Sequence, residues 1–211
     1  MAYRMRKMTV TKIEEVTKAK CRIEIDQEFA FVLYKGELRM YHIREGEELD
    51  PAIYEEIVGK LLPKRATMRA MNLLKSRPYT EYQLRQKLSM GGYPQDAQEE
   101  AISYVKSYHY IDDHRYAVNY LNSRGKVRSS RQVEQELLYK KGVSKAVLEA
   151  AREEAEPQDE REQIRRWMEK KHIDPAAADQ SELRRFYQFL MRRGFRSSDI
   201  LTELLLDRTL N

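Results

Sequence analysis

Hydrophobic and polar positions follow two different periods along this chain, and the period changes near residue 50. Before that point apolar residues alternate with polar ones or form short aromatic runs, which is typical of strands. The runs are residues 21–25, 28–34 and 37–43. Short polar breaks at 26–27 and 35–36 separate them, so we expect a small antiparallel β-meander. Gln27 stands in a turn that glycine would form more easily.

From residue 50 onward apolar residues recur every three to four positions, the period of helices packed along one face. Asp50 precedes Pro51, which places a capping side chain before a first-turn proline. The helix that begins there is expected to end at Pro63.

Three later segments repeat one pattern, an amphipathic helix that ends in glycine followed by an apolar residue. They are residues 84–93, 133–143 and 186–195. Their glycines, Gly92, Gly142 and Gly194, stand where a helix terminus adopts left-handed backbone. The second segment has one extra residue before its glycine, so either Leu137 or Leu138 could occupy the position of Leu88.

The helix starts repeat as well. Thr80 with Gln83, and Ser129 with Gln132, have the spacing of a capping box, whereas the third segment has none at that position. A further helical stripe precedes each segment and another follows it, so each unit is predicted to contain three helices.

The sequence therefore predicts a mainly α protein in which three tandem three-helix repeats form an elongated, curved array behind the β-meander. The expected parts are a β-rich extension with a helix at 1–62 and repeats at 63–111, 112–156 and 157–211.

Composition agrees with a helical, highly charged protein. Of the 211 residues 35% are charged, above the roughly 25% of an average domain, and only 8 are Gly and 6 Pro. The single cysteine, Cys21, excludes an internal disulfide and is interpreted as a small core residue. No long apolar run and no signal-peptide pattern occurs, so we expect a cytoplasmic protein without a membrane partner.

A net charge of +5 conceals clusters of bases on either side of the second and third glycine turns. Clustered bases can bind nucleic-acid phosphates or an acidic protein groove, although each single base is more commonly part of a solvated helix face. The candidate contact residues are Arg124, Lys126, Arg128, Arg131, Lys140, Lys141, Arg184, Arg185, Arg192, Arg193 and Arg196.

Tyrosines could add base stacking to these charges. The spacing of most of them fits helical packing better, and Tyr116 and Tyr120 are expected to share one face. Tyr139 and Tyr187 are left as surface candidates.

Nothing in the chain predicts an enzyme, a metal site or a cofactor. The four histidines lack ligand spacing, and no phosphate loop or dinucleotide fingerprint occurs. Asp112 and Asp113 could be paired metal ligands, but one of them is better explained as the cap of the helix that follows.

Several of these elements together resemble the RecX family, bacterial regulators of the RecA recombinase. They are the Tyr110-Ile111-Asp112-Asp113 run followed by Tyr116-Ala117, the Lys140-Lys141-Gly142-Val143 turn and the Arg192-Arg193-Gly194-Phe195 turn. The resemblance covers about residues 66–207. The chain departs from a regular pattern in the extra residue of the second repeat and in a third repeat without the Asp-Asp element.

The resemblance implies a monomeric non-enzyme that lies along a RecA filament on single-stranded DNA. It implies inhibition of ATP hydrolysis, strand exchange and co-protease activity in DNA repair and the SOS response. Repeated contacts with successive protomers would add avidity without one tight site. The alternative is a helical-repeat module that binds nucleic acid directly, and an enzyme built on Asp112 and Asp113 is the third hypothesis.

Overall fold

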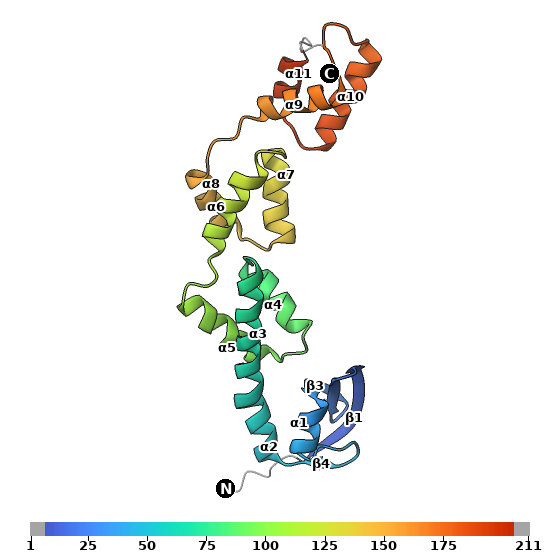
Figure 1. The fold of residues 1–211 in the computed structure, drawn as a ribbon, viewed down its shortest axis with the longest axis vertical. Helices are drawn as coiled ribbons and strands as arrows, with labels where there is room; N and C mark the ends of the chain where they lie inside the picture. The colour runs from blue at the N-terminus through green and yellow to red at the C-terminus, as the bar shows by residue number, and fades with distance from the viewer. Residues whose placement is uncertain (1–6, 205–211) are drawn as a thin grey trace. The chain divides into compact units, whose positions relative to one another are not determined.

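A computed structural model describes residues 7–204 of the chain, and Figure 1 shows the order of its elements. The chain divides into two compact units, residues 1–111 and 112–211, which are described in turn.

The first unit begins with a four-stranded antiparallel sheet of order β3-β2-β1-β4. The strands are β1 (Met8–Thr17), β2 (Lys20–Ile25), β3 (Glu28–Tyr34) and β4 (Glu48–Leu49). Ile23 lies at the centre of the sheet, opposite Ile13 on one side and Phe31 on the other, and it is fully buried. Two of the three predicted strands, 21–25 and 28–34, are thus confirmed.

The turn between β2 and β3 places two non-glycine residues in left-handed backbone. The φ angles are 51° at Asp26 and 70° at Gln27. Side-chain hydrogen bonds to β1 hold this turn: the Thr9 amide donates to the Asp26 carboxylate (3.0 Å), and the Gln27 amide donates to the Thr11 hydroxyl (2.9 Å). These bonds offset the strain that glycine would have avoided.

The prediction of a strand at 37–43 is wrong, because residues Lys35–Met40 form helix α1. The Glu37 carboxylate accepts a hydrogen bond from the Tyr34 amide (2.7 Å) and also pairs with Arg65, which fixes the start of the helix. The seven residues 37–43 are too short a stretch for alternation to distinguish a strand from a helix. In place of the predicted strand, the sheet contains β1, which precedes the predicted runs in sequence, and the short β4.

Helix α2 (Pro51–Glu56) begins as predicted, since the Asp50 carboxylate accepts a hydrogen bond from the Ala52 amide (2.8 Å). The helix does not end at Pro63, however. It passes through a π-helical turn, η1 (Ile57–Leu61), into α3 (Leu62–Ser76). A proline ring clashes with the carbonyl four residues earlier in a regular helix, and the wider π turn directly before Pro63 removes that conflict.

Helices α3, α4 (Glu81–Ser89) and α5 (Gln95–Ser107) form the first three-helix unit. The capping box at Thr80 is confirmed: the Gln83 amide donates to the Thr80 hydroxyl (3.2 Å), and the Thr80 amide donates to the Gln83 side chain (3.4 Å). Buried residues of these helices and of the sheet form one continuous hydrophobic cluster. Cys21 is part of it, as predicted.

The second compact unit contains two more three-helix arrangements, each with its own hydrophobic cluster. The second consists of α6 (Asp113–Arg124), α7 (Ser130–Gln135) continued by the π-helical turn η2 (Glu136–Lys140), and α8 (Lys145–Glu154). The third consists of α9 (Glu160–Lys171), α10 (Gln180–Arg192) and α11 (Ser197–Glu203). The mainly helical fold behind an N-terminal antiparallel sheet is confirmed.

The extra residue of the second repeat is absorbed by η2. The Val143 amide donates to the Leu137 carbonyl (3.0 Å), just as Tyr93 donates to Leu88 and Phe195 to Leu190. Leu137 is fully buried, so it is the counterpart of Leu88. All three repeat glycines have positive φ, between 68° and 82°, as their positions predict.

Candidate interaction surface

Four of the predicted bases surround Tyr120 and Glu136 in the second three-helix unit. Glu136 is only 8% exposed, and its carboxylate accepts from the Tyr120 hydroxyl (2.8 Å) and pairs with Arg128 (2.5 Å). Lys140 lies 3.6 Å from the same carboxylate. The remaining two bases, Arg124 and Lys141, lie over the Tyr120 ring at 6.0 and 5.5 Å from its centroid.

The electrostatics of this group favour the protonation states that hold it together. Burial raises the pKa of Tyr120 to about 12, and its hydrogen bond to Glu136 adds to the rise. Burial alone would raise the pKa of Glu136, but the Tyr120 hydrogen bond and the charges of Arg128 and Lys140 outweigh it and lower that pKa. Arg128 and Lys140 therefore neutralise a buried carboxylate of their own chain.

A second group of bases meets where the second and third three-helix units touch. The Ser129 hydroxyl donates to the Arg193 carbonyl oxygen (2.5 Å), although 64 positions separate the two residues. Gly194, with φ of 82°, fits against this contact, since a Cβ there would lie 3.0 Å from the Ser129 hydroxyl and 3.6 Å from Cβ of Arg131. This close approach places Arg131 beside the basic end of α10.

Between α7 and the end of α10 lies a pocket of about 270 Å³, here called the arginine pocket. Its side chains are Arg131, Gln132, Gln135, Met191, Arg192 and Arg193. The Arg193 guanidinium lies 4.4 Å from the ring centroids of both Trp167 and Phe189, which fixes its orientation. Arg131 and Arg192 are exposed and form no ion pair within residues 7–204.

Trp167 also lines a neighbouring pocket of about 190 Å³, here called the tryptophan pocket. Its other residues are Lys126, Val127, Gln163, Arg166 and Lys170. Gln163 is 4% exposed and donates to the Gly125 carbonyl, while its side-chain oxygen has no partner. Arg166 pairs with Glu162, whereas Lys126 forms no ion pair in the described part of the chain.

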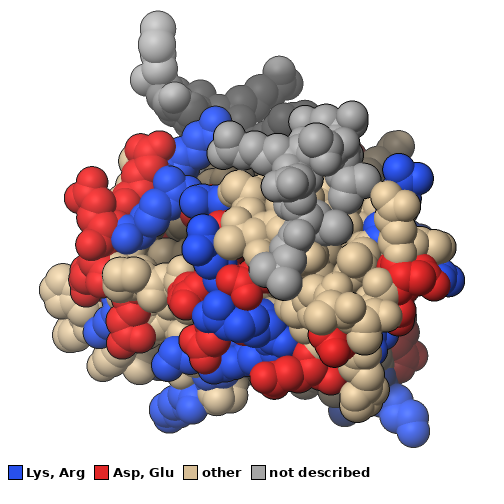
Figure 2. Space-filling model, turned by 90° about the horizontal axis from the view of Figure 1, so that it is seen from above, with Lys and Arg blue, Asp and Glu red and all other residues tan. Residues whose placement is uncertain are grey.

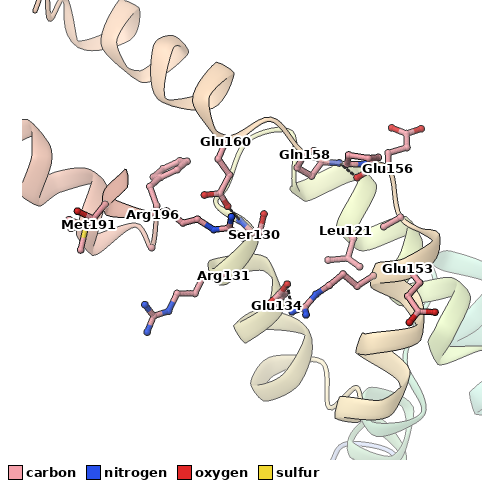
Figure 3. A pocket seen from close by; sticks show the side chains of 16 residues that line it. Leu121, Ser130, Arg131, Glu134, Glu153, Glu156, Gln158, Glu160, Met191 and Arg196 are labelled. Atoms are coloured by element: carbon pink, nitrogen blue, oxygen red, sulfur yellow. Dashed lines mark hydrogen bonds and ion pairs between the residues drawn. The ribbon is translucent and has the colours of Figure 1, made fainter. Parts of the chain in front are cut away.

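Another pocket of the second compact unit, about 680 Å³, carries both signs of charge (Figure 3). Arg131 and Arg196 lie toward one end, and Glu153 and Glu156 lie toward the other. At its centre Glu160 accepts from the Ser130 amide (2.8 Å). This mixture is less selective for an anion than the arginine pocket, to which no carboxylate contributes.

The predicted bases thus separate into three groups. Arg124, Arg128, Lys140 and Lys141 serve the Tyr120–Glu136 group. Arg131, Arg192, Arg193 and Arg196 are brought together at the junction, with Lys126 nearby in the tryptophan pocket. Arg184 and Arg185 are exposed on α10 and line none of these pockets.

Many other bases of the third three-helix unit are neutralised by carboxylates. Arg161 pairs with Asp199 (3.3 Å), and Arg165 pairs with Glu203 (3.0 Å). On the face drawn in Figure 2, Lys and Arg side chains accordingly lie beside Asp and Glu.

The aromatic predictions are partly confirmed. Tyr116 and Tyr120 share a face, with ring centroids 5.9 Å apart, and Tyr139 is 78% exposed. Tyr187 is half-buried and bonds Ser197. Core packing is wrong for three exposed tyrosines whose rings contact one another at and just beyond the end of α5: Tyr104, Tyr108 and Tyr110.

Sequence reasoning missed Gln132, Gln135 and Trp167 as members of a basic surface. Trp167 packs against the third hydrophobic cluster, as a residue of the helical stripe that precedes the third segment would. Trp167 is the single tryptophan of the chain, and that was the one feature of the sequence that could have drawn attention to it.

Asp112 has the predicted capping role, because its carboxylate accepts from the Arg115 amide (2.9 Å). Among residues 7–204, no three His, Cys, Asp or Glu side chains gather as metal ligands would. None of the helices described has the length and apolar character to cross a bilayer.

Comparison with known proteins gives a consistent result. Two family models match, the first three-helix domain of RecX at residues 66–104 and the third at 158–202. The "Regulatory protein RecX" of Caldanaerobacter subterraneus subsp. tengcongensis is 32% identical over 196 residues, which are 92% of this chain and 96% of that protein. That of Vibrio campbellii is 36% identical over 144 residues, 68% of this chain and 90% of its own.

Solved structures share the fold. A crystal structure of regulatory protein RecX has a TM-score of 0.61 at 22% identity and covers 94% of this chain and 98% of its own. The crystal structure of RecX from Lactobacillus salivarius has a TM-score of 0.55 at 18% identity, with 68% of this chain and 95% of its own covered.

Proposed function

Because the chain belongs to the RecX family, we propose that this regulatory protein binds the RecA filament on single-stranded DNA and inhibits its activities. The activities are ATP hydrolysis, strand exchange and co-protease function in DNA repair and the SOS response. The observation that supports the proposal is the 32% identity to a relative named "Regulatory protein RecX", over 96% of that protein. The partner and the direction of the effect are parts of the proposal.

The arrangement of charge supports a regulatory contact rather than catalysis. Exposed arginines at the junction of the second and third three-helix units have no acidic partner in the described chain, so they are free to meet phosphates or acidic side chains. A chain of similar units offers several such contacts, and linked contacts raise avidity without one deep pocket.

The test is the steady-state ATPase rate of RecA on single-stranded DNA while the protein is titrated in. We expect hydrolysis to fall at substoichiometric protein. The informative variant reverses Arg131 and Arg196 to Glu, since both are exposed and neither pairs with a carboxylate in the described residues. Reversing Arg128 or Lys140 would be uninformative, because it would place a second negative charge beside buried Glu136.

A matched control reverses Lys60 and Lys64, two exposed bases of the first compact unit, and changes the net charge equally. Suppression that survives in the control but weakens in R131E/R196E supports the proposal. Unchanged hydrolysis at saturating, folded protein would contradict it.

A further inference from the structure

Two pockets of the second compact unit, the arginine pocket and the tryptophan pocket, are alike in their lining and adjoin each other. No carboxylate lines either of them, whereas Glu and Asp side chains line the other two pockets found there. They also meet at one residue, because Arg193 lines the arginine pocket while its guanidinium stacks on Trp167. The two pockets are thus one side chain apart.

The arginine pocket has the chemistry of a phosphate site. Arg131 and Arg192 carry charges that nothing in the described chain neutralises, and guanidinium groups bind phosphate oxygens through paired N–H donors. Gln132 and Gln135 add amide donors. The carbonyl groups at the end of α10 do not compete, since the Phe195 and Gly194 amides and the Ser129 hydroxyl occupy those of Leu190, Met191 and Arg193.

The tryptophan pocket has the chemistry of a base site. Trp167 is half-buried and lines the pocket together with Lys126 and Lys170, and the Lys170 ammonium lies over the indole ring, 5.1 Å from its centroid. The unpartnered Gln163 side-chain oxygen is an acceptor for N–H groups and belongs to a residue more than nine-tenths buried. Indole rings stack on nucleobases in proteins that bind single strands.

We propose that these two pockets together bind one stretch of single-stranded nucleic acid, with backbone phosphate in the arginine pocket and a base against Trp167. The proposal rests on the proposed function for its ligand and gives the filament regulator its own DNA contact. A carboxylate-rich peptide would satisfy the arginines but would give Trp167 no planar base to stack on. Nucleic acid satisfies both pockets at once.

The single tryptophan provides a local readout, because all indole fluorescence of the chain comes from Trp167. The full-length protein, without RecA, is titrated with an oligothymidylate of about twelve nucleotides, a length within the range that single-strand sites cover. We expect saturable quenching of Trp167 fluorescence. An abasic oligomer of the same length, inorganic phosphate and polyglutamate are the comparison ligands.

The variant R131Q/R192Q removes two charges from the arginine pocket. We expect its oligothymidylate affinity to fall about tenfold or more, and the slope of log affinity against log salt to decrease by about 1.4, from two contacts at about 0.7 each. The matched control R184Q/R185Q removes the same charge from α10 outside the pockets and should change affinity less than about threefold.

Three results would overturn the proposal: no quenching by the oligomer, equal quenching by the abasic oligomer or polyglutamate, or equal losses in the two double variants. Circular dichroism of each variant shows whether a loss reflects unfolding. The ATPase assay separates the two hypotheses. If the protein inhibits RecA but does not bind free DNA, the binding site proposed here is refuted and the proposed function stands. If the protein binds DNA but does not inhibit RecA, the binding site stands and the proposed function is refuted.

Discussion

Gly92→Ala tests whether the first three-helix unit is docked on the N-terminal sheet through its turn glycine. Gly92 has a φ of 77°, and a Cβ built on it would lie 2.3 Å from Cγ2 of Val32 in β3. Any side chain there must both adopt left-handed backbone and displace Val32. Gly46 has a φ of 83°, but a Cβ built on it would meet no atom within 4 Å. Gly46→Ala therefore measures the cost of left-handed backbone alone.

The two costs can be estimated separately. Left-handed backbone destabilises an L-residue by about 1–2 kcal/mol, which is the full expectation for G46A. Forcing an extra methyl group into a packed contact adds about 1–3 kcal/mol, so G92A should lower the free energy of unfolding by about 2–5 kcal/mol. The difference between the two variants, about 1–3 kcal/mol, measures the contact between Gly92 and Val32.

Urea denaturation followed by far-ultraviolet circular dichroism measures both variants. The double variant V32A/G92A completes the test, because removing the Val32 methyl groups relieves the overlap and should make the double variant more stable than the sum of the single effects predicts. Equal losses in G92A and G46A, together with additive behaviour of V32A, would refute the docking argument.

Three further predictions concern the second compact unit. Because Tyr120 has a pKa of about 12 instead of 10.0, the native state keeps a proton that the unfolded chain loses. The urea midpoint should therefore fall as the pH rises from 10.0 to about 12, and less so in Y120F. In thermal denaturation, D112A should cost about 0.5–2 kcal/mol and D112N almost nothing, since Asn also caps helices; equal losses would contradict the capping role. L137A should cost about 2–5 kcal/mol in urea, clearly more than L138A at its half-buried neighbour, and the reverse order would refute the register.

The parts of the fold that sequence predicted are those encoded by residues close together along the chain. The Thr80 capping box and the turn glycines act on backbone groups three to six residues away, so their spacing alone carries the information. The two errors have tertiary causes. Alternation at residues 37–43 predicts a strand because Glu37, which helps to start helix α1, pairs with Arg65, 28 positions away in sequence. Pro63 predicts a helix end because a π-helical turn leaves no pattern in hydropathy.

The candidate bases were identifiable by type, but their roles were not. Arg128 and Arg131 are indistinguishable as candidates in the sequence, since both belong to the same basic segment. In the structure Arg128 neutralises buried Glu136, whereas Arg131 lines a pocket without carboxylates. That difference depends on which groups tertiary packing places within about 4 Å, a distance that charge patterning along the chain does not encode. Trp167 was missed for the same reason, since Arg193 reaches it only through the fold.

The turn glycines explain how one repeated structural unit acquires the arginine pocket. Gly92 and Gly194 end equivalent helices, and each is packed against the element that precedes its unit: Gly92 against Val32 of the sheet, and Gly194 against Ser129 and Arg131 of the second three-helix unit. The same turn thus serves as a docking point in both places, and the residues around it determine the chemistry. Against the sheet it meets half-buried Val32 of β3. Against the second unit it brings Arg192 and Arg193 beside Arg131, so a contact that stabilises the fold also assembles the arginine pocket.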